Sequence, residues 1–150
     1  MSLKMTRQER EEFLAGLHVG VMSVAAAGRG PLTLPIWYAY EPGGEVVVIT
    51  AANSTKARLL GETGRFSLCA QTEEPPYKYV SVEGAVTKVE PASLERDGRP
   101  MAHRYLGPEL GDAYVESTRA LAAGSVVIHM RPERWNTVDY GKEFATQAGS

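Results

Sequence analysis

The pattern of apolar and polar positions predicts a chain of short strands with helices at its start and near its end. Six segments have the alternating or continuous apolar pattern of strands: 19–27, 32–40, 45–50, 65–71, 77–91 and 125–130. Helices are expected from the capping box at 6–9, over 56–62 and 94–106, and from 108 to about 121. Because no strand–helix–strand unit repeats, the pattern favours a mainly β fold, a six-stranded antiparallel barrel with peripheral helices.

Three irregularities refine this picture. Pro35 interrupts the second strand, and because proline has no N–H to donate, it marks an edge or a bulge. In the fifth strand the apolar phase slips between Val86 and Val89, which predicts a bulge. Segment 45–50 is apolar at nearly every position, as in strands covered on both faces. One small barrel cannot bury both faces of such a strand, so we expect a second copy of the chain to cover it in a homodimer.

Length and composition indicate one domain over residues 1–150, with flexible ends expected at 1–5 and 145–150. A net charge of -2 without a basic stripe argues against nucleic-acid binding. The single cysteine, Cys69, excludes an internal disulfide and is expected to be buried and inert. No signal peptide is visible, and no apolar stretch approaches the roughly 20 residues that span a bilayer, so we expect a cytoplasmic protein without a membrane partner.

The usual catalytic and metal-binding motifs are missing. The chain has no GxSxG, HExxH or CxxC sequence, and its glycine-rich turns join hairpins. His18, His103 and His129 lie in three separate predicted elements without the spacing of a zinc site. We therefore expect no metal and assign no catalytic residue from the sequence.

One segment has the features of a phosphate site. A buried strand ends at Thr50, and Ser54 and Thr55 then precede a helix with Lys56 and Arg58 near its start. Free N–H groups, the helix dipole and a lysine charge together favour an anion. The alternative is an ordinary helix cap followed by solvated basic residues.

Aromatic residues form a second signal, because a flat heterocycle binds well between aromatic walls. They cluster at 37–40, at 77–79, and at Trp135 with Tyr140. Packing in the core explains most of them equally well. Trp37, just after Pro35, fits either interpretation.

The ordered stretches Leu17-His18-Val19-Gly20, Leu34-Pro35-Ile36-Trp37-Tyr38, Ser54-Thr55-Lys56-Ala57-Arg58 and Pro76-Tyr77-Lys78-Tyr79 resemble the pyridoxamine 5'-phosphate oxidase-like FMN-binding split-barrel superfamily. Within it, the chain looks most like the B branch of the flavin/deazaflavin oxidoreductases, which use coenzyme F420. Segment 104–109 also resembles that branch, and the likeness covers about residues 6 to 142.

This resemblance implies cofactor-binding roles for particular residues. Lys56 occupies the position that binds the cofactor phosphate, with Ser54, Thr55 and Arg58 around it. Some relatives have an arginine where Ser54 stands. The ring system would be lined by Pro35, Ile36 and Trp37 above Thr50, and the partner subunit would close the site with Tyr77 and Tyr79.

The implied function is hydride transfer from reduced coenzyme F420 to an electron-poor small molecule in a homodimer. The cofactor carries the reactivity, which agrees with the absence of an obvious acid, base or nucleophile. Two alternatives stay open. One is an FMN-dependent oxidoreductase of the pyridoxamine-phosphate oxidase type, and the other is a non-catalytic haem or tetrapyrrole-binding protein on the same barrel.

Overall fold

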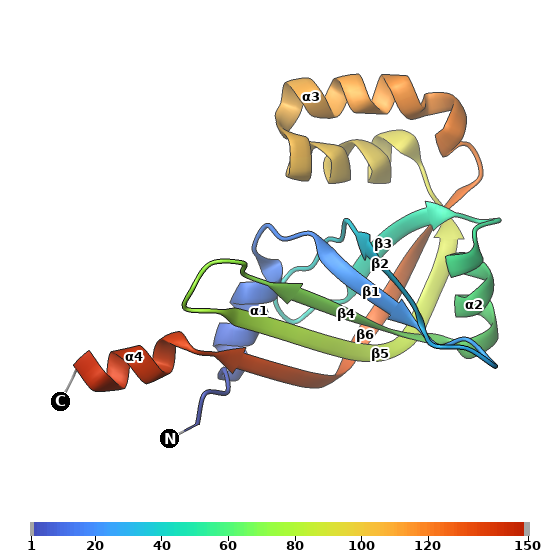
Figure 1. Ribbon diagram of the computed structural model, residues 1–150. Helices are drawn as coiled ribbons and strands as arrows, with labels where there is room; N and C mark the ends of the chain where they lie inside the picture. Colours follow the sequence, from blue (N-terminus) through green and yellow to red (C-terminus); the bar gives the residue numbers. More distant parts are fainter. Residues whose placement is uncertain (1, 149–150) are drawn as a thin grey trace.

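A six-stranded antiparallel sheet forms the body of the molecule (Figure 1). The structure, a computed structural model, describes residues 2–148, with side chains described through residue 144. The strands are β1 (Gly20–Val24), β2 (Leu32–Ile36), β3 (Val46–Ala51), β4 (Arg65–Gln71), β5 (Lys78–Pro91) and β6 (Ser125–Asp139). Their order is β2-β1-β4-β5-β6-β3, and the sheet curls into a half-barrel. The predicted split β-barrel fold is confirmed.

The core lies inside the curl of the sheet. Alternate residues point inward along the strands, so Met22, Leu68, Val82 and Met130 are almost completely buried. Helix α1 (Arg7–Ala15) adds Leu14 to the same apolar cluster. Each such side chain stabilises the fold by about 1.5–3 kcal/mol through its removal from water.

The long strands β5 and β6 are paired with two irregularities. Their register shifts between Val86 and Lys88, which confirms the predicted bulge, and again between Glu83 and Gly84. At the second shift Gly84 pairs with Pro132, and strand β6 continues to Asp139. The predicted end at residue 130 is therefore wrong, because pairing with β5 carries the chain through the proline.

Two strands are shorter than their apolar patterns predict. Strand β1 ends at Val24, not at residue 27, and β2 ends at Ile36, not at residue 40. Beyond β2 only an isolated bridge between Ala39 and Val47 remains. As predicted for a strand that contains Pro35, β2 lies at an edge of the sheet.

The helices begin and end at the predicted signals. Thr6 and Glu9 form the capping box of α1. Helix α2 (Thr55–Thr63) is capped by Ser54 and ends at Gly64, whose φ of 66° is left-handed. A π-helical turn, η1 (Leu94–Gly98), leads into α3 (Arg99–Ala122), which breaks at Gly107 with a φ of 80°. Because of this break, η1 and α3 form a helical hairpin above the barrel (Figure 1).

Near its start the chain contacts strand β6, and near its end it forms a helix. Met5 is buried, and its N–H donates to Thr137 Oγ1 at 3.0 Å. Helix α4 (Gly141–Ala148) occupies most of the segment in which a flexible end is expected. Residues 1, 149 and 150 lie outside the described residues. Between residues 2 and 148, no helix has the length and apolarity needed to cross a membrane.

Two side chains of the first half of α3 fasten the hairpin to the barrel. The Arg104 guanidinium donates to the carbonyls of Gly16 (2.8 Å), Ala15 (3.2 Å) and Tyr38 (3.2 Å). The Tyr105 hydroxyl lies 2.6 Å from the carbonyl of His18 and accepts the Tyr38 N–H at 3.1 Å. We refer to these contacts as the Arg104–Tyr105 clamp.

The tight pairing at Gly84 gives a first prediction. A Cβ atom at this position would lie 1.7 Å from the Arg131 carbonyl oxygen, so Gly84→Ala must displace backbone and should destabilise the protein by about 3 kcal/mol or more. Gly61→Ala is the matched control: Gly61 is exposed on helix α2, a Cβ there would meet nothing within 4 Å, and the substitution should stabilise the protein by about 0.5–1 kcal/mol. Urea unfolding of both variants measures the difference, and equal stabilities would contradict this account.

The clamp gives a second prediction. Tyr105→Phe leaves the His18 carbonyl and the Tyr38 N–H without their partner, which should cost about 1–3 kcal/mol of unfolding free energy. Tyr140→Phe serves as control, because the Tyr140 side chain is exposed and should tolerate loss of its hydroxyl within about 0.5 kcal/mol. Denaturant unfolding followed by circular dichroism compares the two, and a Tyr105→Phe protein as stable as its parent would exclude the clamp.

Candidate functional site

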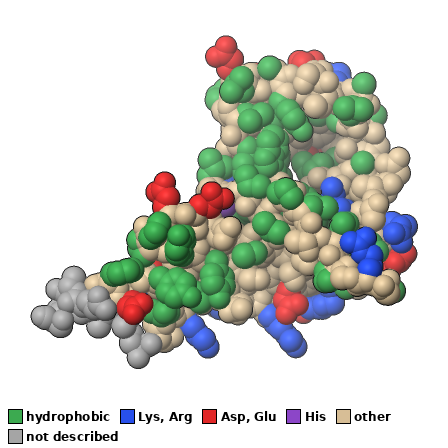
Figure 2. Space-filling model, in the orientation of Figure 1, with side chains coloured by type: hydrophobic (Ala, Val, Ile, Leu, Met, Phe, Trp, Pro, Cys, Tyr) green, Lys and Arg blue, Asp and Glu red, His purple; other side chains and the backbone are tan. Residues whose placement is uncertain are grey.

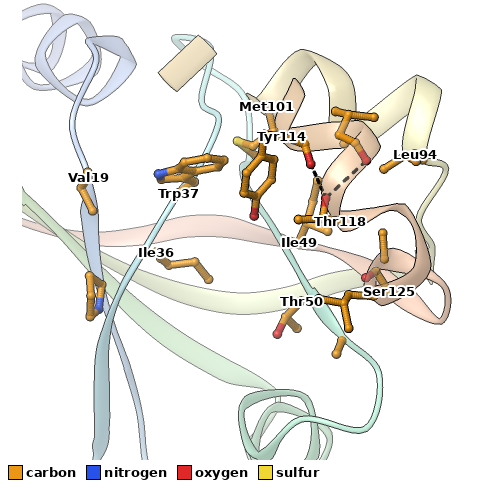
Figure 3. A pocket seen from close by; sticks show the side chains of 16 residues that line it. Val19, Ile36, Trp37, Ile49, Thr50, Leu94, Met101, Tyr114, Thr118 and Ser125 are labelled. Carbon is orange, nitrogen blue, oxygen red and sulfur yellow. Dashed lines mark hydrogen bonds between the residues drawn. The ribbon is translucent and has the colours of Figure 1, made fainter. Parts of the chain in front are cut away.

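A cavity of about 590 Å³ lies between the helical hairpin and the barrel. Figure 2 shows the hollow beneath the hairpin, with apolar side chains along its edge. The barrel contributes one wall and η1 and α3 contribute the other (Figure 3). The cavity is lined by Val19, Pro35, Ile36, Trp37, Ile49, Thr50, Ala51, Leu94, Gly98, Met101, Tyr114, Val115, Thr118, Leu121, Ala122 and Ser125.

The barrel wall contains four of the predicted cofactor-binding residues: Pro35, Ile36, Trp37 and Thr50. The Trp37 ring stacks on Tyr105 with centroids 5.0 Å apart and planes 4° apart. It also lies 5.2 Å from the Tyr114 ring, at 51°. Trp37 is thereby held as a flat, rigid surface at the edge of the cavity.

Thr50 connects the cavity with the start of helix α2. Its hydroxyl lies 3.2 Å from Ser54 Oγ, which also accepts the Ala57 N–H at 3.1 Å and so caps the helix. The Thr50 side chain is buried, and it lines the cavity (Figure 3). The Ser54 cap of helix α2 therefore contacts Thr50, which forms part of the cavity wall.

The first turn of α2 has free donors. Within residues 2–148, the N–H groups of Thr55 and Lys56 have no acceptor, as expected at a helix start. In the same part of the chain the half-buried Lys56 has no salt bridge. Arg58 differs, because it is exposed and its Nη1 lies 3.0 Å from Glu62 Oε1. Ser54 is thus hydrogen-bonded to the cavity-lining Thr50, and Thr55 and Lys56 follow it in the first turn of α2 without lining the cavity, while Arg58 pairs with Glu62 along the helix.

Tyr79 lies at the opposite end of the sheet, with Tyr77 just before β5. Tyr79 pairs with Val138, whereas Thr50 is opposite Val126, which in turn pairs with Pro91. Twelve residues of strand separate Tyr79 from Pro91, a distance of up to about 40 Å in extended backbone. One chain does not bring these tyrosines to the cavity, so their assignment to the partner subunit's side stays a prediction.

Sequence reasoning missed the helical wall. Tyr114, Thr118 and Leu121 lie four and three residues apart, the spacing of one helix face, and all three line the cavity. This spacing is visible in the sequence and could have indicated a helix face that lines a site. The sequence does not show where that face packs, because the clamp and the break at Gly107 set its position.

The cavity is uncharged. No Asp, Glu, Lys, Arg or His is among the residues that line it. His18 bonds the Phe13 carbonyl, and burial lowers the pKa of its imidazole. His103 lies 2.6 Å from Asp112, and His129 lies near Glu45 and Glu90. The described side chains include no group of three that could hold a metal ion. The arrangement suits a flat, uncharged ring system with an anionic group at the start of α2.

Comparison with solved structures shows that this fold is shared. The conserved hypothetical protein Rv2991 from Mycobacterium tuberculosis aligns with a TM-score of 0.76 and 24% identity over 95% of this chain and 91% of its own. An F420 reductase aligns with a TM-score of 0.70 and 21% identity over 84% of this chain and 94% of its own. A FAD-binding protein from Mesorhizobium loti aligns with a TM-score of 0.63 and 17% identity over 89% of this chain and 93% of its own.

Sequence comparison identifies the family. No curated protein matches the chain. A family model for pyridoxamine 5'-phosphate oxidase matches residues 6–139, which is nearly the whole described chain and includes both the barrel and the hairpin. On this evidence the chain belongs to the pyridoxamine 5'-phosphate oxidase family.

Proposed function

We propose that this protein is a reductase that binds coenzyme F420, with the ring system in the cavity and the phosphate at the start of α2. One observation carries this proposal. Thr50, which lines an apolar cavity, is hydrogen-bonded to Ser54, which caps a helix whose first N–H groups are free. On this proposal an anion site would adjoin a pocket for the ring system. Membership of a flavin-type oxidoreductase family supports the same class of ligand.

The residues present fit such a cofactor. A volume of about 590 Å³ lies within the range of about 300–1,000 Å³ found for small-molecule pockets. Trp37 offers a flat surface to a ring system. The Thr55 and Lys56 N–H groups, the helix dipole and the Lys56 ammonium favour a phosphate beside it.

The surroundings of the phosphate position favour F420 over FMN. Ala51, Ala52 and Asn53 are small and exposed, so they leave room for a long acidic tail beyond the phosphate. FMN has a shorter tail and would use the same ring and phosphate contacts. Haem is disfavoured, because no histidine lines the cavity.

The residues of this chain would bind and orient the cofactor and exclude water. When bound, the reduced deazaflavin supplies a hydride for an electron-poor acceptor. Pro35, Ile36 and Trp37 would fix the ring plane, while Val115 and Thr118 cover it from the hairpin. The protein needs no nucleophile for this chemistry, and none lines the cavity apart from hydroxyl groups.

The proposal includes a homodimer. Leu17, Val19 and Val21 form an apolar strip with 60%, 53% and 37% exposure, and Val19 also lines the cavity. In β3, Val46 and Val48 are fully buried, whereas Val47 and Ile49 are only half-buried. A second chain over the strip would cover this apolar surface and close the open side of the cavity.

Lys56 gives the prediction that tests the cofactor site. Lys56→Ala removes a charge-assisted contact and should weaken F420 binding about ten- to hundredfold, with little change in apo stability. Lys88→Ala is the control, because Lys88 is an exposed lysine paired with Glu90 and should bind as the parent does. Fluorescence titration with F420 and with FMN measures both affinities.

Each titration outcome has a defined meaning. Unchanged affinity in a folded Lys56→Ala protein would refute the phosphate site. Saturable FMN binding without any response to F420 would mean that the cofactor is FMN, bound at the same site.

The dimer gives a further prediction. Light scattering at micromolar concentration should give twice the mass of the chain, and Val21→Arg should give the mass of one chain with weakened cofactor binding. Val89→Arg makes the same change at another exposed valine, on β5, and should leave the dimer intact. A stable monomer in the unaltered protein would refute the dimer.

A further inference from the structure

The Tyr114 hydroxyl is a hydrogen-bonding group over an apolar cavity, and the contacts proposed above for the cofactor do not use it. The Tyr114 ring packs against Trp37, and Figure 3 shows its hydroxyl pointing away from the α3 backbone into the space near Ile36, Ile49 and Thr50. Among the described residues, no group donates to this hydroxyl or accepts from it. It is therefore available to a ligand.

The other polar groups of the cavity are less suited to this role. Thr118 Oγ1 donates to the Tyr114 carbonyl at 2.7 Å, and the Thr50 hydroxyl is shared with Ser54. The Trp37 ring nitrogen points away from Tyr114, and Ser125 lies at the far edge of the cavity (Figure 3). Tyr114 is thus the available donor beside the flat surface of Trp37.

Tyr114 packs against Trp37, and ion pairs connect the helix arm that carries it to the arm before Gly107. Asp112, two residues before Tyr114, lies 2.6 Å from Arg99 Nη1 and 2.6 Å from His103 Nε2. Arg99 also lies 3.5 Å from Glu116, so it links the arm before Gly107 to the arm after it at two points. A hydroxyl held in place before the ligand arrives binds at a lower entropic cost.

The walls define the chemical class of the ligand. None of the 16 lining residues is charged, and burying an unpaired charge against them would be costly. We infer that the substrate is an uncharged, flat conjugated ketone or aldehyde whose carbonyl oxygen accepts a hydrogen bond from Tyr114. This inference rests on the proposed function, because it names the substrate class of the same site.

Trp37 provides a direct binding signal. The chain has two tryptophans, so a Trp135→Phe background isolates the fluorescence of Trp37. The probes are acetylnaphthalene, ethylnaphthalene and naphthylmethylammonium, which share one ring system and carry a ketone, a hydrocarbon group and a positive charge. Calorimetry on protein that retains Trp135 gives the same comparison if the background variant does not fold.

Tyr114→Phe should weaken acetylnaphthalene binding about three- to tenfold and leave ethylnaphthalene binding unchanged, because only the ketone loses a hydrogen bond. Naphthylmethylammonium should bind more weakly than the ketone in both proteins, because the uncharged walls offer its charge no partner. Tyr140→Phe, a change at an exposed tyrosine on another part of the surface, should alter no affinity.

Several results would overturn the inference: equal ketone affinity with and without the hydroxyl, an equal loss for ethylnaphthalene, tight binding of naphthylmethylammonium, or no binding of any probe. These titrations contain no cofactor and do not involve Lys56. Their failure is therefore distinct from failure of the cofactor site, which the Lys56→Ala titration reports.

Discussion

The Arg104–Tyr105 clamp is the interaction on which the candidate site depends. The hairpin of η1 and α3 stands above the barrel, and these two side chains bond backbone groups at the end of α1 and just after β2. Those carbonyls lie outside regular strands, so they need donors from elsewhere in the chain. A guanidinium near the last carbonyls of α1 also interacts favourably with the helix dipole. Without the clamp the cavity would lose one wall.

The same clamp also positions Trp37, because the Trp37 ring stacks on Tyr105. Strand β2 lies at the sheet edge and ends at Ile36, one residue after Pro35, so Trp37 leaves the sheet and stacks on Tyr105. At the next residue the Tyr38 side chain turns into the core, where its hydroxyl donates to the Leu14 carbonyl at 2.6 Å. Burial raises the pKa of this hydroxyl, which keeps it a donor. The wall of the cavity thus follows from a proline, an edge strand and one aromatic contact.

The sequence predicts elements well where the signal is local and poorly where it depends on a distant partner. Strand β4 has its predicted bounds, and Gly64 ends α2, because periodicity and capping are local. The far half of β6 is not predictable in this way, since Pro132 is accommodated only opposite Gly84. The site divides similarly. Pro35 to Trp37 and Ser54 to Lys56 are short contiguous motifs, whereas the helical wall is positioned by contacts some 90 residues apart in the chain, as from Arg104 to Gly16.

Energetics give the strongest reason to regard the start of α2 as a binding site. A lysine in a first helical turn opposes the dipole, so it does not favour folding there. Arg58, two residues further along the same helix, is paired with Glu62, and Arg65 is paired with Glu133. Lys56 has no such carboxylate among the described residues, although free N–H groups lie beside it. Positive potential from three sources therefore accumulates at the start of α2, an arrangement that costs stability in the free protein and that a bound anion would offset.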